Sequence, residues 1–140
     1  MCLDREGGWT FESRPVENRR VAELFHRGVR PGEVTGEYIL QVGEQWCFIE
    51  AVEDTAFFVS KFRRKQDGAL EMTLLGGEVV AFANSALSQA GDTDVYATLP
   101  DGRRARFLRD AVVALAPLLV ECGGGFGIEN EGQVRSISVE

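Results

Sequence analysis

The sequence predicts an α+β fold in which a helix followed by antiparallel strands occurs twice. Apolar residues recur at helical spacing in two segments, one after Asn18 and one after Arg109. Each segment is followed by short runs of β-branched and aromatic residues, separated by glycine-containing breaks. The series of helix, break, strand, turn and strand runs from 16 to 53 and again from 109 to 140, which predicts an internal duplication. We expect two repeat halves, 1–62 and 63–140, packed as one compact unit.

The first half predicts a short strand, a helix and three further strands. Residues 9–11 form the short strand, Asn18 is a suitable helix N-cap, and Gly28 or the corner at 30–32 ends the helix. The apolar side chains of this helix recur at Val21, Leu24 and Phe25. The three strands that follow are expected at 37–42, 46–52 and 56–62. In the third, alternation places Phe58, Ser60 and Phe62 on one face and Val59, Lys61 and Arg63 on the other.

Turn signals organise the start of the second half. Asp67-Gly68, Gly76-Gly77 and Pro100-Asp101-Gly102 are typical of hairpins. They predict strands at 69–75, 78–83, 94–99 and 103–108. Small polar residues at 84–92 predict a loop.

A second helix is expected from Arg109, buried on more than one side. Its principal apolar face would comprise Leu108, Val112, Leu115, Ala116 and Leu119. Pro117 should kink or end it, because proline lacks the N–H that an interior helical residue donates. Glycines 123–125 are interpreted as a helix stop and tight turn, before a closing strand at 134–139. They do not predict a phosphate loop, which would need the N-terminus of a helix.

Composition limits the function classes. The chain has 140 residues, 44% apolar and 26% charged, which is typical of a folded globular protein. Its formal net charge of −7 argues against nucleic-acid binding, and its longest apolar run, 111–120, is too short to span a bilayer. No signal peptide is visible. Three widely spaced cysteines, Cys2, Cys47 and Cys122, favour reduced thiols and a cytoplasmic location.

Catalytic constellations are not visible in the sequence. His26 is the only histidine, so no multi-histidine metal site can form, and any catalytic triad would depend on this one residue. We interpret it as a partly exposed helix residue rather than a base. The expectation is a protein that is not an enzyme and holds no metal or cofactor.

Charged residues offer the best candidate site. Glu53 and Asp54 follow the second expected strand, where a loop on a rigid scaffold can carry polar function. Arg106 lies on one face of the strand expected at 103–108, Arg109 opens the second helix, and arginine suits phosphate or carboxylate. The alternatives are solvated turn residues, or structural salt bridges between such arginines and Glu44, Glu53 or Asp54.

Several short motifs in order carry a family resemblance. They are Pro15-Val16, Arg19, Leu24-Phe25, Gly36-Glu37-Tyr38, Glu44, Val52-Glu53-Asp54, Phe57 and the segment Ala105-Arg106-Phe107-Leu108-Arg109. Together they resemble the bacterial domain-of-unknown-function family numbered 1285, over nearly the whole chain from Trp9 to Ile137. Val42-Gly43 replaces the Thr-Pro that usually precedes the glutamate, and Thr55-Ala56 replaces the proline after the acidic pair.

The resemblance implies a duplicated α+β fold whose C-terminal half is like a pleckstrin-homology domain. It also implies a ligand site between the halves, for a nucleotide-like or other anionic small molecule, and a role in signalling.

Three hypotheses follow. The first is a cytoplasmic binding or sensor domain in which five residues converge on an anionic ligand: Glu44, Glu53, Asp54, Arg106 and Arg109. The second is a protein-interaction module that uses an exposed sheet edge or apolar patch. The third, an unrecognised hydrolase or transferase, would need His26 beside Cys47 or a carboxylate.

Overall fold

The computed structural model, which describes residues 1–140, has an α+β fold of many short strands and two short α-helices. The chain divides into two units. Unit 1 comprises Met1–Phe57 with Leu75–Glu78, and unit 2 comprises Phe58–Leu74 with Val79–Glu140. The two predicted repeat halves, 1–62 and 63–140, packed as one compact unit, stay a prediction. Neither helix is long and apolar enough to cross a membrane.

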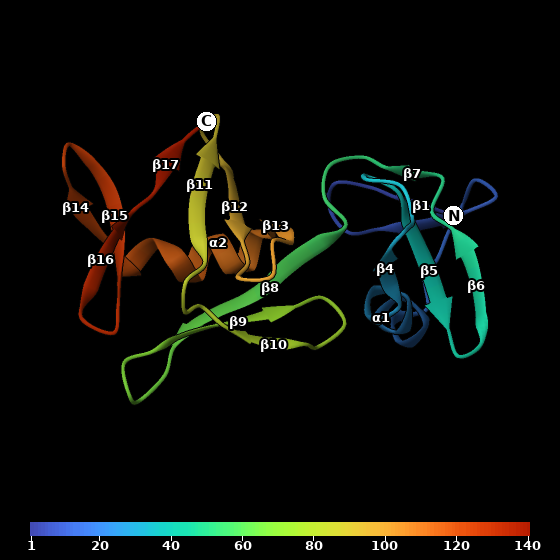
Figure 1. Ribbon diagram of the computed structural model, residues 1–140, viewed down its shortest axis with the longest axis horizontal. Helices are drawn as coiled ribbons and strands as arrows, with labels where there is room; N and C mark the ends of the chain where they lie inside the picture. Colours follow the sequence, from blue (N-terminus) through green and yellow to red (C-terminus); the bar gives the residue numbers. More distant parts are fainter. The chain divides into compact units, whose positions relative to one another are not determined.

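Unit 1 contains two small sheets and one helix (Figure 1). The four-stranded sheet has the order β3 (Arg14–Pro15), β2 (Trp9–Phe11), β1 (Cys2–Leu3) and β7 (Ala51–Val52). The three-stranded sheet has the order β4 (Val29–Pro31), β5 (Tyr38–Val42) and β6 (Gln45–Phe48). Helix α1 (Arg19–Arg27) connects the two sheets along the chain. The apolar core of the unit includes Leu3, Trp9, Val29, Leu40 and Ile49.

Helix α1 begins and ends where the sequence predicts. The Asn18 side chain accepts a hydrogen bond from the backbone N–H of Val21 at 3.1 Å, and the Gly28 N–H donates to the Phe25 carbonyl. Gly28 then lies against β5: a Cβ at this position would overlap the Gln41 carbonyl oxygen, which leaves room only for glycine. The glycine therefore ends the helix and also lets β4 approach β5.

The β5–β6 hairpin is the predicted strand pair with its predicted turn. Val42 pairs with Gln45, so two residues, Gly43 and Glu44, connect the strands. Gly43 has φ +62°, a conformation that glycine adopts readily and that suits the tightest hairpin turns. This short connection fixes the register of the hairpin and thus which side chains share a face.

Unit 2 is built on a seven-stranded sheet. Its order is β10 (Val79–Ala81), β9 (Leu70–Leu74), β8 (Phe57–Arg64), β13 (Arg104–Phe107), β12 (Asp94–Thr98), β11 (Ala86–Ala90) and β17 (Ser138–Val139). A bulge between Val59 and Lys61 interrupts β8, so its side chains do not alternate between the two faces as simply as predicted. Phe58, Val59 and Phe62 are all buried, while Lys61 and Arg63 point to solvent.

The segment at 84–92, predicted as a loop, contains strand β11. Its side chains are small and polar, but it pairs residue by residue with β12, from Ala86 opposite Thr98 to Ala90 opposite Asp94. Only Leu87 is buried in this strand. Strand pairing therefore overrides the weak local preference, because a neighbouring strand satisfies the backbone whatever the side chains are.

The end of the chain also departs from the prediction. Helix α2 (Arg109–Leu115) is shorter than expected, and Pro117 lies in a 3-10 turn, Ala116–Leu118, that ends it. Leu119, predicted on the helix face, begins strand β14 (Leu119–Cys122). Gly123 and Gly124 have positive φ and form the hairpin turn into β15 (Gly125–Asn130), so they do not stop a helix.

A polar link ties this last hairpin to the large sheet. Strands β14, β15 and β16 (Gln133–Ser136) form a three-stranded antiparallel sheet. Buried Asn130 accepts a hydrogen bond from the Leu70 N–H at 2.9 Å, and Arg64 donates to the Glu129 carbonyl at 3.0 Å. These bonds attach β15 to the β8–β9 hairpin.

We expect Gly28→Ala to destabilise the protein by about 1–3 kcal/mol, the usual cost of forcing extra volume into a packed site. The added methyl would meet a backbone oxygen, which cannot move without disturbing β5. Urea unfolding measures this loss. Gly125→Ala is the matched control, because its Cβ would meet nothing closer than 3.9 Å. Equal stability of the two variants would contradict the close packing of Gly28.

Candidate functional site

The five residues predicted to bind a ligand are divided between the units. In unit 1, Glu53 and Asp54 directly follow β7, whereas Glu44 lies in the β5–β6 turn. The whole of β6 separates Glu44 from the acidic pair. In unit 2, Arg106 lies in β13 and Arg109 is the first residue of α2. Their convergence on one ligand stays a prediction.

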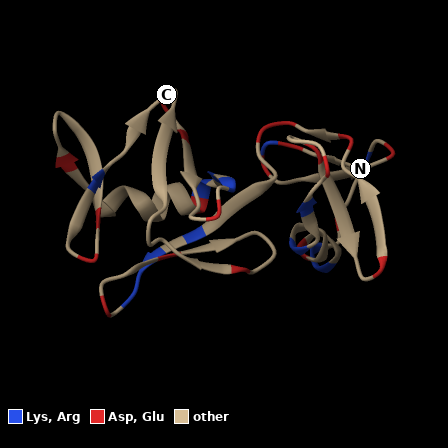
Figure 2. Cartoon of the chain, in the orientation of Figure 1, with Lys and Arg blue, Asp and Glu red and all other residues tan.

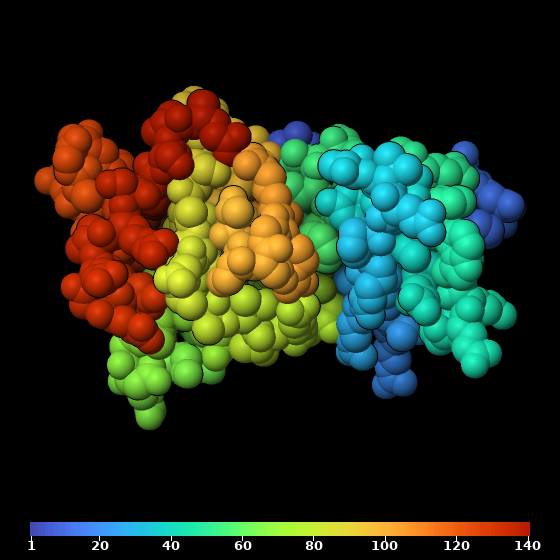
Figure 3. Space-filling model, in the orientation of Figure 1, coloured from blue at the N-terminus to red at the C-terminus, as the bar shows by residue number.

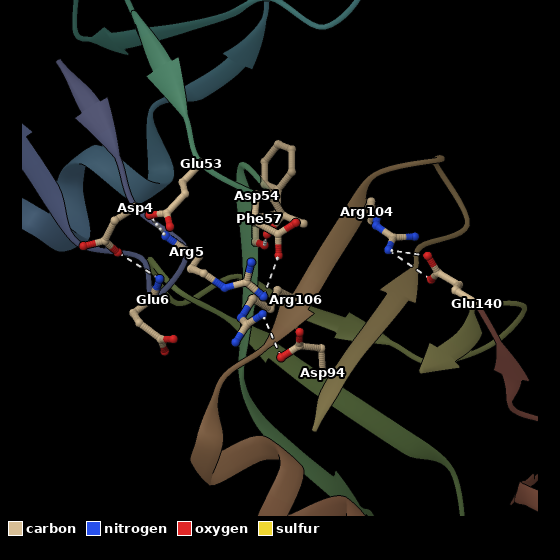
Figure 4. A network of polar contacts seen from close by, with 11 residues as sticks. Asp4, Arg5, Glu6, Glu53, Asp54, Phe57, Asp94, Arg104, Arg106 and Glu140 are labelled. Atoms are coloured by element: carbon tan, nitrogen blue, oxygen red, sulfur yellow. Dashed lines mark hydrogen bonds and ion pairs between the residues drawn. The ribbon is translucent and has the colours of Figure 1, made fainter. Parts of the chain in front are cut away.

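Glu53 and Asp54 belong to a polar cluster at the start of the chain (Figure 4). The Arg5 N–H donates to Glu53 Oε2 at 3.0 Å, and the Arg5 guanidinium lies 4.0 Å from Asp54 Oδ2. Asp4 accepts hydrogen bonds from the N–H groups of Glu6 and Gly8, both at 2.8 Å. Asp4 therefore closes the turn after β1, and Glu53 and Asp54 anchor Arg5 within it, contacts that sequence reasoning missed because it passed over Arg5.

Two arginines of β13, Arg104 and Arg106, form ion pairs within unit 2. Arg106 Nη1 lies 3.1 Å from Asp94 Oδ1, and only 11% of the Arg106 side chain is exposed. Tyr96 pairs directly with Arg106 across β12 and β13, which places Asp94 diagonally opposite the arginine. The salt-bridge alternative named Glu44, Glu53 and Asp54 as partners. The strand register adds Asp94 as a partner of Arg106, and pairing with those three acids stays a prediction.

Arg104 is held by a second arrangement on the same sheet. Its Nη2 donates to both carboxylate oxygens of Glu140 at 3.0 Å, and its guanidinium carbon lies 4.0 Å from the centre of the Tyr96 ring. Ser88 donates to the same carboxylate at 2.6 Å. Arg109, by contrast, is exposed at the start of α2.

His26 is half-buried and contributes to packing. Trp9 Nε1 donates to His26 Nε2 at 3.2 Å, and a hydrogen bond joins the imidazole to the backbone of Gly7. Burial lowers the pKa of His26 below its usual value, and the Gly7 hydrogen bond acts in the opposite direction. The neutral ring thus links α1 to β2.

A cleft lies on one face of the β4–β5–β6 sheet and has a volume of about 410 Å³. Its lining residues are Pro31, Gly32, Glu33, Glu37, Ile39, Gln41, Trp46 and Phe48. Trp46 and Phe48 are 58% and 53% exposed, and their rings stand perpendicular with centres 5.1 Å apart. Figure 3 shows the β5–β6 segment, in turquoise, at the surface of unit 1.

Strand register explains why the cleft residues share a face. Ile39 pairs with Phe48 and Gln41 pairs with Trp46, so all four side chains project on the same side of the sheet. Leu40, on the opposite side, is buried in the core. At one end of the cleft the Glu37 side chain packs directly over Gly32, where a Cβ would collide with it. The face is therefore aromatic with an acidic border.

Two other clefts are smaller. One lies at the glycine hairpin of β14–β15 and has a volume of about 380 Å³, and the other lies beside Asn84 and Arg135 and has a volume of about 220 Å³. No group of three or more His, Cys, Asp or Glu side chains is arranged to hold a metal ion.

Comparison with known proteins identifies the fold. No protein-family model and no curated protein matches the chain. A crystal structure of a DUF1285 family protein from Silicibacter pomeroyi DSS-3 superposes with a TM-score of 0.74 and 20% identity, over 96% of this chain and 76% of that one. The chain has the DUF1285 fold. A DUF1285 protein from Shewanella baltica OS155 agrees, with a TM-score of 0.59 and 20% identity over 83% of this chain and 89% of that one.

The DUF1285 fold confirms the resemblance that the short motifs predict. Both structures are described only as DUF1285 family proteins. They therefore support the fold of this chain and give no information on its activity.

We expect the free energy of unfolding to fall as the pH drops below about 6.5, the ordinary histidine pKa. The folded state holds His26 neutral, so the unfolded state binds the additional proton and acidification favours unfolding. Protonation would also turn Nε2 from an acceptor into a donor facing the Trp9 N–H. Urea unfolding at pH values above and below 6.5 measures how steeply the free energy of unfolding changes with pH.

His26→Gln is the control for this slope, because it removes the only histidine. An unchanged pH slope in His26→Gln would show that another group is responsible.

Trp9→Phe should lower the free energy of unfolding by about 1 kcal/mol at neutral pH, because it removes the hydrogen bond to His26.

Proposed function

We propose that the protein is a non-catalytic binding domain that recognises a partner protein through the cleft face of the β4–β5–β6 sheet. The observation that carries this proposal is the exposed perpendicular pair of Trp46 and Phe48. Exposed apolar patches rimmed by polar residues mark interaction sites, and tryptophan is among the residues that dominate binding energy at protein interfaces. Glu33 and Glu37 supply such a rim.

The energetic reason lies in the apolar area left in water. Aromatic side chains bury about 150–250 Å² each when fully covered. Covering the exposed half of both rings would contribute roughly 5 kcal/mol at the usual value per unit area. A partner that covers this face therefore gains a large part of a typical binding free energy from two residues.

The engagement of His26 supports a non-catalytic role. Its Nε2 accepts from Trp9, and its ring is hydrogen-bonded to Gly7, so the imidazole holds the fold together. A hydrolase or transferase built on this residue would first have to break both contacts.

An anionic small molecule, such as a nucleotide-like signalling ligand, is the second candidate. Arg106, whose side chain is 11% exposed, and exposed Arg109, three residues later at the start of α2, favour it, because arginine binds phosphate and carboxylate through paired donors. In that hypothesis Glu44, Glu53 and Asp54 supply the acidic groups.

We also propose that the two halves arose by duplication. In support, α1 precedes the antiparallel strands β4, β5 and β6, and α2 precedes the antiparallel strands β14, β15 and β16. The pleckstrin-homology likeness of the C-terminal half stays a prediction. A crystal structure in which α1 with β4–β6 and α2 with β14–β16 do not superpose with the same handedness would contradict duplication.

Three free cysteines support a reducing compartment for the protein.

Selection of random displayed peptides on the purified protein tests the partner-binding proposal. We expect the selected peptides to bind Trp46→Ala at least about tenfold more weakly, as at an interface hot spot. Folding stability should change little, because the ring is largely exposed. Val113→Ala, which removes a 64% exposed apolar side chain on α2, is the matched control and should bind normally.

Peptides that bind Trp46→Ala as tightly as the wild type would contradict the proposal. A nucleotide or phosphate that raises the melting temperature of the wild type but not of Arg109→Ala would favour the second candidate.

A further inference from the structure

The cleft on the β4–β5–β6 sheet is lined by two acidic residues and by no basic one. All of its lining residues lie in the segment 31–48, and the chain contains no Lys or Arg from 31 to 57. The Glu33 and Glu37 carboxylates line the cleft, and neither makes a hydrogen bond or ion pair within the chain. Acidic residues also outnumber basic ones in unit 1, and Figure 2 shows them in red. The cleft therefore attracts positively charged groups.

One arginine of unit 1 lies on the same side of this sheet but is held by other groups. Arg30 pairs with Ile39 in the strand register, which places both on the cleft side. Its Nη1 donates to the Arg27 carbonyl at 2.7 Å and to the Val29 carbonyl at 3.0 Å, and Arg30 does not line the cleft. The carbonyls at the end of α1 and in β4 thus engage this guanidinium, which leaves the two carboxylates of the cleft for a ligand.

The aromatic part of the cleft suits a planar organic cation. The rings of Trp46 and Phe48 stand at right angles with centres 5.1 Å apart, and more than half of each side chain is exposed. Two perpendicular rings form a corner in which one bound group can approach both. A cation over the face of a tryptophan is attracted by the electron density of the ring, and arginine takes this position more often than lysine does. The rings and the carboxylates of the cleft therefore favour the same kind of ligand.

We propose that the cleft binds an arginine side chain of a partner protein, with the guanidinium stacked on Trp46 and its N–H groups donating to Glu33 and Glu37. This inference rests on the proposed function, and it names the group that the partner must carry. A guanidinium is planar and weakly hydrated, stacks on aromatic rings and pairs with carboxylates through two parallel donors. The ammonium of lysine is a compact, strongly hydrated point charge. Arginine thus satisfies the rings and the carboxylates together, whereas lysine satisfies only the carboxylates.

Two other occupants fit the cleft less well. A divalent cation such as calcium takes six or more oxygen ligands, and no group of three or more His, Cys, Asp or Glu side chains is arranged to hold a metal ion. A second copy of this chain carries the same formal net charge of −7, so electrostatic repulsion opposes its approach. An arginine on a basic segment of a different protein meets neither obstacle.

The test uses the intact protein and three capped peptides, Gly-Leu-X-Leu-Gly, in which X is arginine, lysine or citrulline. Citrulline has the shape of arginine without its charge. An NMR titration that follows the indole N–H of Trp46 gives the three dissociation constants. The arginine peptide should bind about tenfold more tightly than each of the other two, because hydrogen bonds between charged groups are the stronger ones and only arginine also stacks as a cation. Added salt should narrow the difference between arginine and citrulline through screening.

Two variants separate the carboxylates from the rings. Glu33→Gln with Glu37→Gln keeps the shape of the cleft and removes its charge, so the arginine and citrulline peptides should bind this variant equally. Trp46→Leu keeps an apolar side chain and removes the ring, so the preference for arginine over lysine should fall severalfold. Glu23→Gln, which removes an exposed acidic residue of α1 outside the cleft, is the matched control and should leave all three dissociation constants unchanged.

Equal affinity of the wild type for the arginine and citrulline peptides, no binding of the arginine peptide at millimolar concentration, or an unchanged preference in the double glutamine variant would each overturn the inference. Wild-type dimerisation that this variant abolishes would assign the cleft to a second copy, and would overturn it too. The proposed function fails separately. If randomly selected peptides require Trp46 but bind equally well with citrulline in place of arginine, the cleft remains a partner site and the arginine assignment is wrong. If Trp46→Ala leaves every peptide bound, both fail.

Discussion

The register of the β5–β6 hairpin is the constraint on which the functional account depends. Strand β5 has neighbours on both sides, whereas β6 has only one. The two-residue turn at Gly43 and Glu44 fixes the register, and the register sends the polar groups of alternate residues outward. The same register sets Phe48 opposite Ile39 and Trp46 opposite Gln41, so both rings project on the cleft face.

The same small set of contacts holds this sheet in place. Gly28 ends α1 and allows β4 to approach β5, and His26 joins the helix to Trp9 in the neighbouring sheet. Leu40 and Val29 fill the buried side of the sheet, which leaves the opposite side for recognition. Helix capping, core packing and site presentation in unit 1 therefore rest on adjacent residues.

Local signals predicted much of the fold and little of the site. The Asn18 cap, the Gly43 turn and the Asp67-Gly68 hairpin were predictable because each acts within a few residues. Strand β11 and the helix-to-strand change at Leu119 were not, since distant pairing partners decide them. For the site, the strand at 46–52 was predicted, but no local pattern shows which of its side chains share a face that is left uncovered.

Amide hydrogen exchange of the free protein, followed residue by residue by NMR, tests the central claim most directly. The β5–β6 register predicts rapid exchange of the Trp46 and Phe48 N–H groups. It also predicts slow exchange of the Cys47 and Ile49 N–H groups, which bond to β5. Slow exchange at Trp46 and Phe48 with rapid exchange at Cys47 and Ile49 would mean a register shifted by one residue, which turns both rings to the buried side, and would contradict the account.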